Sequence, residues 1–400
     1  MNRNIKALHA IAVKPQRRII GLMSGTSVDG LDIACCDVEG AGLDTQLRVT
    51  AFATIPYDAD FREEIASVFS RRQVDLEKLC LLNAWVALRQ ASMVNEFLHM
   101  HGIQKAEVDL IASHGQTIYH APRSLHGSGK FGNATLQIGD GDHFAVATGI
   151  ITLSDFRQKH IAAGGEGAPL AVYGDYLLFS RKGEDRIMLN MGGVANFTCL
   201  PGTLDPDKVF STDTGPGNTM MDAWMRMHFP GKYFDADAAV ARRGTVVEPL
   251  LSALKDHPFF SQPFPRTTGP ELFNLTYLVS AAEKAGISMP SPEDTMATLN
   301  RFSADTIADA ILQISGESRD LVLYASGGGM HNPLLMDNIR QRIPGISVKL
   351  TSSLGIEPDA KEAVLFAVLA NECVAGGEVR YGTAREGIPS VTMGKISFPG

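Results

Sequence analysis

The chain contains two pairs of matching segments, and this repetition constrains its fold more than any other feature. Residues 18–40 read as a strand, a glycine-rich turn and a second strand, and residues 186–200 repeat that arrangement. Residues 109–122 and 320–333 share a second pattern, in which Asp-Leu, an apolar strand, Ala-Ser and a glycine-bearing turn precede His and Pro. Motifs this short can recur by coincidence. The stronger interpretation is an internal duplication that produces two α/β domains of similar design.

Helices are expected between these segments. Apolar residues recur near the helical period over 75–100 and 299–314. A third helix is expected over 359–374, where the first residue would be the N-cap and Glu362 would complete a capping box. Strands that alternate with helices indicate an α/β class with mostly parallel pairing. Residues 259–270 form a Pro-rich loop too long for a simple connector, and such loops are often functional.

The composition excludes several classes of protein. Lys and Arg number 36 against 44 Asp and Glu, a net charge of −8, and no basic block is present, which argues against nucleic-acid binding. No apolar run reaches the roughly 18 residues that a membrane helix needs. The 5 cysteines contain no CxxC pair and are expected to be buried thiols in a reducing compartment. We therefore expect a cytoplasmic protein with a ragged N-terminal extension over residues 1–17.

Glycine-rich turns replace the common nucleotide-binding motifs. The sequence has no GxxxxGK[ST] motif, no GxGxxG motif that opens a helix and no GxSxG motif. Backbone N–H groups at glycine-rich turns can approach an anion, so two such turns could clamp a triphosphate. Each of two turns contains an aspartate, Asp29 and Asp213. One could hold the hydration shell of Mg²⁺ and the other could accept a proton from the attacking nucleophile. The alternative is that both are ordinary turn residues. The turns lie at residues 25–30, 192–193, 213–218 and 327–329.

Seven motifs, in order, resemble the anhydro-N-acetylmuramic acid kinase family, which belongs to the sugar-kinase/Hsp70/actin superfamily. They are GLMSGTSVDGLD (21–32), ASHGQTIYHAP (112–122), TLQIGDG (135–141), SDFR with AAGGEGAPL (154–170), NMGGVAN (190–196), DTGPGN with MMDAW (213–224) and SGGGMHNPLLM (326–336). The resemblance extends from about Arg18 to the C-terminus. It implies an α/β, duplicated two-domain actin-like fold with an interdomain cleft, in agreement with the duplication.

The resemblance also implies a reaction and its cofactors. The family uses ATP, with Mg²⁺, and water to open the anhydro bridge of 1,6-anhydro-N-acetylmuramic acid and phosphorylate the freed O6. The products are N-acetylmuramic acid 6-phosphate and ADP, in peptidoglycan recycling. Asp213 matches the catalytic base, and Asp29 is the expected metal ligand. The residues expected to bind ATP are Gly25, Thr26, Ser27, Val28, Asp29, Gly30, Leu31, Asp32, Gly192, Gly193, Gly327, Gly328 and Gly329.

The sugar is expected to contact side chains outside these turns. Arg157 offers a planar fork to the lactyl carboxylate, although a structural ion pair is an equal alternative. Glu362 matches an acidic residue beside the sugar, and its alternative is the capping box. His114 is expected in a loop after a buried strand, where its side chain could bond a sugar hydroxyl. The alternative is that His114 is a structural residue held by hydrogen bonds. The sugar-binding set is His114, Gln116, Thr117, Arg157, Asn218 and Glu362.

The chain departs from the family at three positions. His160, Glu166 and Ala121 stand where the family usually has Asp, Gln and often Glu. Because these departures affect the sugar pocket, a related kinase acting on another amino or anhydro sugar is an alternative. A nucleotide-driven interaction module like Hsp70 or actin is another. The predicted domains are 18–155 with 376–400, and 156–375, with no nucleic-acid or membrane partner and a homodimer as one option.

Overall fold

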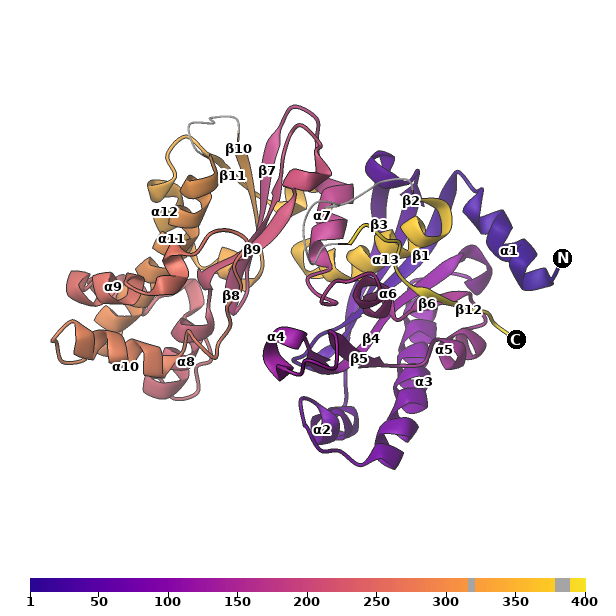
Figure 1. The fold of residues 1–400 in the computed structure, drawn as a ribbon, viewed down its shortest axis with the longest axis horizontal. Helices are drawn as coiled ribbons and strands as arrows, with labels where there is room; N and C mark the ends of the chain where they lie inside the picture. The colour runs from indigo at the N-terminus through magenta and orange to yellow at the C-terminus, as the bar shows by residue number, and fades with distance from the viewer. Residues whose placement is uncertain (316–320, 378–388) are drawn as a thin grey trace. The chain divides into compact units, whose positions relative to one another are not determined.

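The computed structural model describes residues 1–315, 321–377 and 389–400, and it divides into two compact units (Figure 1). Unit 1 comprises Met1–Ser180 and Gly355–Gly400, and unit 2 comprises Arg181–Leu354. These bounds differ from the predicted domains, because residues 156–180 and 355–375 lie in unit 1. The cause is helix α13 (Lys361–Ala375), which packs against α7 (Ala171–Phe179) and the central strands of unit 1.

Unit 1 is built on a mixed sheet with the strand order β12-β6-β4-β1-β2-β3, and β5 pairs with β4. Strands β1, β2 and β3 form an antiparallel meander, whereas β4 runs parallel to β1 and β6 runs parallel to β4. The strands are β1 (Gln16–Ser24), β2 (Gly30–Glu39), β3 (Gln46–Pro56), β4 (Leu110–Ala121), β5 (Ala134–Ile138), β6 (Thr152–Ser154) and β12 (Lys395–Ser397).

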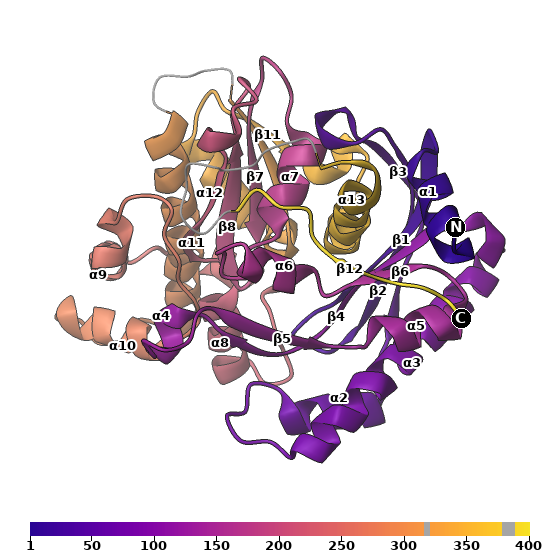
Figure 2. The same cartoon turned by 45° about the vertical axis from the view of Figure 1, so that its right-hand side comes forward.

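Helices cover both faces of this sheet. Helix α13 contacts β1, β2 and β4, whereas α3 and α5 pack together and share a core with the sheet on its other face (Figure 2). Asp75 caps α3 by accepting a hydrogen bond from the N–H of Lys78. A Cβ on Gly21 would lie 1.9 Å from the carbonyl oxygen of Ala363, so only glycine lets α13 approach β1 this closely. The helices are α1 (Arg3–Ala12), α2 (Ala59–Val68), α3 (Leu76–Met100), α4 (Arg123–His126), α5 (Gly141–Thr148), α6 (Phe156–Ala162), α7 and α13.

Unit 2 repeats the topology of unit 1. Its strand order is β11-β10-β7-β8-β9, in which β7, β8 and β9 form an antiparallel meander and β10 and β11 continue the sheet in parallel. The shared order confirms the duplication predicted from the sequence and the actin-like α/β class. The expectation of mostly parallel pairing was wrong, because the meander in each unit makes antiparallel pairs the more numerous among the described strands. The strands are β7 (Asp185–Met191), β8 (Val194–Leu200), β9 (Phe210–Pro216), β10 (Leu321–Ser326) and β11 (Ser347–Leu350).

The helices of unit 2 enclose a second core. Helix α11 is its long central helix and begins at Pro292, earlier than the apolar periodicity predicts, because its first turns bury polar residues such as Thr295 and Thr298. No helix in the described ranges is both long and apolar enough to cross a membrane. The helices are α8 (Thr219–His228), α9 (Glu248–Lys255), α10 (Leu275–Lys284), α11 (Pro292–Ser315) and α12 (Pro333–Arg342).

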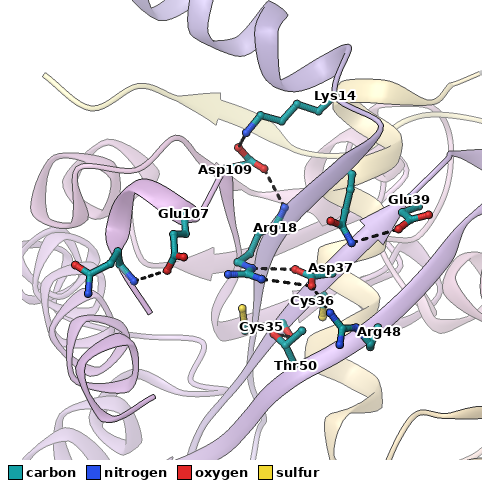
Figure 3. A network of polar contacts seen from close by, with 12 residues as sticks. Lys14, Arg18, Cys35, Cys36, Asp37, Glu39, Arg48, Thr50, Glu107 and Asp109 are labelled. Atoms are coloured by element: carbon teal, nitrogen blue, oxygen red, sulfur yellow. Dashed lines mark hydrogen bonds and ion pairs between the residues drawn. The ribbon is translucent and has the colours of Figure 1, made fainter. Parts of the chain in front are cut away.

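A polar network fixes the start of β1 (Figure 3). The buried carboxylate of Asp37 accepts hydrogen bonds from Arg18 Nε at 2.8 Å and from Arg48 Nη2 at 2.9 Å. The Arg18 hydrogen bond, with help from Arg48, lowers the pKa of Asp37. Asp109 accepts the backbone N–H of Arg18 at 2.9 Å and pairs with Lys14 at 2.5 Å. The network therefore joins β1 to β2, β3 and the residue before β4.

The N-terminal extension is ordered rather than ragged. It forms α1, with Asn2 as the N-cap. The side chain of Asn4 donates to the carbonyl of Pro399 at 3.3 Å, and Arg3 donates to Gly400, so the two ends of the chain lie side by side (Figures 1 and 2). Ile11 is the buried residue of this helix.

The cysteines are free, and only part of the expectation for them is confirmed. Cys35 and Cys36 are buried in β2, and burial raises the pKa of both thiols. Cys80 is exposed on α3, contrary to the expectation, because it lies on the outer face of that helix. Cys199 and Cys373 are partly exposed.

Candidate functional site

Buried hydrogen bonds hold the start of the glycine-rich turn between β1 and β2. Gln90 Nε2 donates to the hydroxyl of Tyr57 at 3.0 Å, which donates to Ser24 Oγ at 2.9 Å. Ser24 Oγ donates to Gln116 Oε1 at 2.5 Å, and Gln116 Nε2 donates to the carbonyl of Gly25 at 3.3 Å. All four side chains are buried. Gln116 is therefore committed to the turn, where its buried amide anchors Gly25.

The rest of the turn exposes its polar residues. Thr26, Ser27 and Asp29 are exposed, whereas Val28, Gly30 and Leu31 are buried and can reach a ligand only through their backbone. Val28 has a φ of 53°, a left-handed conformation that is rare for a β-branched residue and that clusters at functional sites. Asp29 Oδ1 accepts hydrogen bonds from Ser27 Oγ at 3.0 Å and Gly30 N–H at 2.9 Å. The turn thus presents hydroxyls and a carboxylate on a fixed backbone.

Asp32 follows the turn on β2, close to other acidic residues. Its carboxylate accepts a hydrogen bond from Thr54 Oγ1 at 2.6 Å. Burial raises the pKa of Asp32, and the charges of Asp29 and Asp359 raise it further. A cation beside Asp29 and Asp32 would relieve this repulsion. The described residues contain no group of three or more His, Cys, Asp or Glu that could enclose a metal by themselves.

Arg157 and His114 form a second polar group in unit 1. Arg157, at the start of α6, donates from Nε to His114 Nε2 at 3.0 Å and from Nη1 to the carbonyl of Gly167 at 2.7 Å. Burial and the Arg157 charge lower the pKa of His114 to about 3, so the ring is neutral. Among the described residues, no carboxylate lies within ion-pair distance of Arg157, so the structural ion pair that was its alternative is absent.

His114, Gln116 and Thr117 lie within a strand rather than in the predicted loop. Strand β4 continues to Ala121 because its second half pairs with β5, for example through Gln116 and Ile138. Gly115, with a φ of 73°, sits in the middle of the strand, where a Cβ would lie 2.6 Å from the carbonyl of Ile138. The hydroxyl of Thr117 accepts a hydrogen bond from Gln137 Nε2 at 3.2 Å.

The three departures from the family lie at the end of β4, in α6 and in the loop that follows α6. The N–H of Gly167 donates to Nδ1 of His160 at 2.9 Å, and a Cβ on Gly165 would overlap the His160 ring. His160 is buried, and burial lowers its pKa to about 4. Glu166 is exposed, and Ala121 is the last residue of β4. His160 therefore supports the loop that accepts the hydrogen bond from Arg157.

Glu362 does not form the predicted capping box. A short 3₁₀ turn, η9 (Pro358–Ala360), precedes α13, whose N-cap is Ala360 without a side-chain hydrogen bond. The Glu362 side chain is exposed, yet nearby protein atoms and the negative charge of Asp32 raise its pKa, while Arg157 lowers it. Glu362 is thus electrostatically coupled both to the end of the glycine-rich turn and to Arg157.

Asp213 lies on β9 of unit 2, opposite Asn196 of β8. Its Oδ2 accepts the backbone N–H of Thr268 at 2.8 Å. Burial raises the pKa of Asp213 to about 6, opposed by the Thr268 hydrogen bond and helped by the charge of Glu271. The carboxylate is therefore mostly ionised at neutral pH but holds a proton more readily than an exposed aspartate.

The glycine turns of unit 2 are packed against one another. The carbonyls of Gly192 and Gly193 accept N–H groups from residues 217–219 at the start of α8. Asn218 Nδ2 donates to the carbonyl of Met191 at 3.3 Å, and a Cβ on Gly328 would lie 3.7 Å from that Nδ2. Gly327 has a φ of 82° and lies against the end of β7. Asn218 therefore lies among these glycine turns of unit 2.

A cavity of about 600 Å³ lies within unit 1, between α3, the β4–β5 pair, the start of α5 and β12. Of the residues predicted to bind sugar, His114 alone lines it. The sequence reasoning missed several residues that serve the site, namely Tyr57, Gln90, Arg266 and Thr268. The Pro-rich composition of residues 259–270 was the available signal for the last two.

Comparisons with known proteins identify relatives of the chain. The family model for anhydro-N-acetylmuramic acid kinase matches residues 17–389. An anhydro-N-acetylmuramic acid kinase of Pseudoalteromonas atlantica is 56% identical over 400 residues and covers 100% of both chains. One from Caldanaerobacter subterraneus is 36% identical over 96% of this chain and 98% of its own. A ROK family glucokinase from Streptomyces griseus, solved with glucose and AMPPNP, is 12% identical with a TM-score of 0.33, covering 88% of this chain and 98% of its own.

Proposed function

Because the chain belongs to the anhydro-N-acetylmuramic acid kinase family, we propose that it uses ATP and water to convert 1,6-anhydro-N-acetylmuramic acid into N-acetylmuramic acid 6-phosphate. Its partners would be these small molecules, and its place of action the cytoplasm. The observation that carries the proposal best is Arg157, a half-buried cation without a carboxylate partner among the described residues. An anionic sugar supplies the missing partner, because the lactyl carboxylate fits the guanidinium fork.

The turn between β1 and β2 would bind the triphosphate of ATP. Its anchored backbone and its exposed Thr26 and Ser27 hydroxyls are the donors that phosphate oxygens need. Mg²⁺ would be held by Asp29 and Asp32, whose mutual repulsion a cation relieves, and it would neutralise charge on the phosphates. The turns at 192–193 and 327–329, with Asn218, would contact the rest of the nucleotide.

Asp213 would be the general base. Its carboxylate would take the proton from the water that attacks the anomeric carbon, and the anhydro bridge would break at that carbon. The released O6 would then attack the γ-phosphorus in line, with ADP as the leaving group. A base with a pKa of about 6 is mostly ionised at neutral pH and remains an efficient proton acceptor. Glu362, coupled to Arg157, would lie beside the sugar.

The test is product analysis with the purified protein, ATP and Mg²⁺. Mass spectrometry in isotopically labelled water should find N-acetylmuramic acid 6-phosphate with one labelled oxygen, which hydrolytic opening would place at the anomeric carbon. The anhydro sugar that lacks the lactyl group should have a KM at least about tenfold higher, because it loses a charged hydrogen bond.

The Arg157→Gln variant should lose this discrimination between the two sugars while its KM for ATP stays unchanged. The matched control is Arg123→Gln, which changes an exposed arginine of the same unit. The proposal fails if the wild-type protein does not phosphorylate the anhydro sugar. The role of Arg157 fails if its variant still prefers the sugar that carries the lactyl group.

A further inference from the structure

The segment from η6 (Pro258–Ser261) to Thr268 lies along β9 and is bonded to it around Asp213. The N–H of Asp213 donates to the carbonyl of Arg266 at 2.9 Å, and the N–H of Arg266 donates to Thr212 Oγ1 at 3.0 Å. Together with the bond from Thr268 to Oδ2 at 2.8 Å, these contacts fix both the backbone and one carboxylate oxygen of Asp213.

The side chain of Arg266 is the centre of this segment and is almost completely buried, with 6% of the residue exposed. Its Nε donates to the carbonyl of Asp213 at 3.3 Å, and Nη1 donates to the carbonyls of Phe259 at 3.2 Å and Phe260 at 2.8 Å. The guanidinium carbon lies 4.7 Å from the ring centroid of Phe259 and 4.8 Å from that of Phe264. Carbonyl oxygens therefore occupy its edge while aromatic rings cover the plane.

Arg266 is a buried cation, and no described carboxylate lies within ion-pair distance of it. Burying an unpaired cation is costly, and carbonyl dipoles and ring faces offset this cost only in part. An apolar residue in the same place would avoid the cost. The positive charge itself therefore needs an explanation.

Asp213 provides that explanation. The charged groups that act on its carboxylate are Arg266 and Glu271, and they act in opposite directions. Burial and Glu271 favour the protonated form of Asp213, whereas Arg266 and the N–H of Thr268 favour the ionised form. A base must be ionised before it can accept a proton from water.

We infer that Arg266 is the positioning residue of Asp213, which holds the strand and loop around that carboxylate and keeps it charged at neutral pH. The inference rests on the proposed role of Asp213 as the base and adds the residue that prepares it. Arg266 touches no reacting atom in this account. Its effect would pass through Asp213 alone.

The test compares Arg266→Met with Arg266→Lys in single-turnover phosphorylation of the anhydro sugar across pH. Arg266→Met should move the acid limb of the pH–rate profile to higher pH by about one unit, because the charge that favours ionised Asp213 is gone. With the pKa of Asp213 starting at about 6, this shift alone lowers the ionised fraction at pH 7 by about twofold, and loss of the positioning contacts should lower the rate further. Arg266→Lys should keep the wild-type acid limb but lose rate, because an ammonium group cannot replace the planar fork. Dissociation constants for ATP and sugar should stay unchanged.

The matched control is Arg186→Met. Arg186 is a buried arginine of the same unit that pairs with Glu184 at 2.6 Å and lies 5.2 Å from the Tyr324 ring, near the start of β7. This variant should lower the melting temperature and leave the acid limb in place. An identical pH profile for Arg266→Met and Arg186→Met would reduce Arg266 to a structural residue and overturn the inference.

Two further variants complete the design. If Arg266→Met does not fold, Arg266→Gln keeps hydrogen-bond donors without the charge and should move the acid limb in the same direction; an unmoved limb would overturn the inference. Asp213→Asn distinguishes failure of the proposed role of Asp213 from failure of the inference about Arg266. If it keeps the wild-type rate, the proposed role of Asp213 fails and the inference with it. If it is inactive while Arg266→Met keeps the wild-type acid limb, only the inference about Arg266 fails.

Discussion

Arg157 donates a hydrogen bond from Nε to Nε2 of His114 across 3.0 Å, and this bond fixes the protonation state of the histidine. Nε2 must be unprotonated to accept it, so Nδ1 carries the hydrogen and donates to the carbonyl of Gly115 at 3.0 Å. Burial and the neighbouring Arg157 charge lower the pKa of His114 to about 3. His114 therefore serves as a neutral support for Arg157 and not as an acid or base.

Replacing His114 should affect the sugar and spare the nucleotide. His114→Ala removes the acceptor that orients Arg157, so the KM for the anhydro sugar should rise by about tenfold, the value of roughly one hydrogen bond to a charged group. His114→Gln offers a carbonyl oxygen in its place and should recover part of the loss. Steady-state kinetics with each substrate varied in turn measures both effects. Equal rises in the KM for ATP and for sugar would refute this role.

Acidification should destabilise the protein through its buried histidines. His114 and His160 have folded pKa values of about 3 and about 4, below the ordinary value near 6.5, so the unfolded chain binds more protons as the pH falls below about 6.5. The free energy of unfolding should therefore fall with decreasing pH by up to about 1.4 kcal/mol per unit for each histidine. Thermal unfolding between pH 7 and pH 5 measures the trend. His160→Gln should flatten it, and an unchanged slope would contradict the assignment.

Valine at Gly25 or Gly328 should weaken ATP binding without unfolding the chain. A Cβ at Gly25 would lie 3.5 Å from Ser27 Oγ, and one at Gly328 would lie 3.7 Å from Asn218 Nδ2, both ordinary contacts. The space that valine would fill at each position is proposed to hold ATP, so the dissociation constant for ATP should rise by about tenfold or more. Calorimetry measures it, with Gly129→Val as the control because a Cβ there meets nothing within 4 Å. Unchanged ATP affinity in both variants would contradict the proposed clamp.

Ser24→Ala should destabilise the protein and loosen the glycine-rich turn. It removes the buried hydrogen bonds that Ser24 makes with the Tyr57 hydroxyl and with Gln116 Oε1, at a cost of about 2 kcal/mol. The exposed Ser27 in the same turn provides the control, because Ser27→Ala should leave the stability almost unchanged. Urea unfolding of both variants measures the difference. Equal stabilities would show that the buried bonds do not hold the turn.

The sequence predicts the architecture well because duplication and helix periodicity are local signals. The strands around both glycine turns and the duplication of the two units follow from such patterns. The loop expected at His114 was wrong, because pairing of β4 with β5 joins residues that a local pattern does not connect. The capping box at Glu362 was wrong because a 3₁₀ turn precedes α13. Arg266 was missed because its partners are backbone carbonyls and rings, which leave no motif.

The most direct test of the account is the turnover of anhydro-N-acetylmuramic acid by folded Asp213→Asn, with ATP affinity measured separately. The variant keeps the shape of the side chain and its bond to Thr268 but cannot accept a proton from water. Loss of general-base catalysis should lower turnover by on the order of 10²–10⁴-fold while ATP affinity is retained. Turnover above about a tenth of the wild-type value, well inside that range, would contradict the account and return Asp213 to an ordinary strand residue.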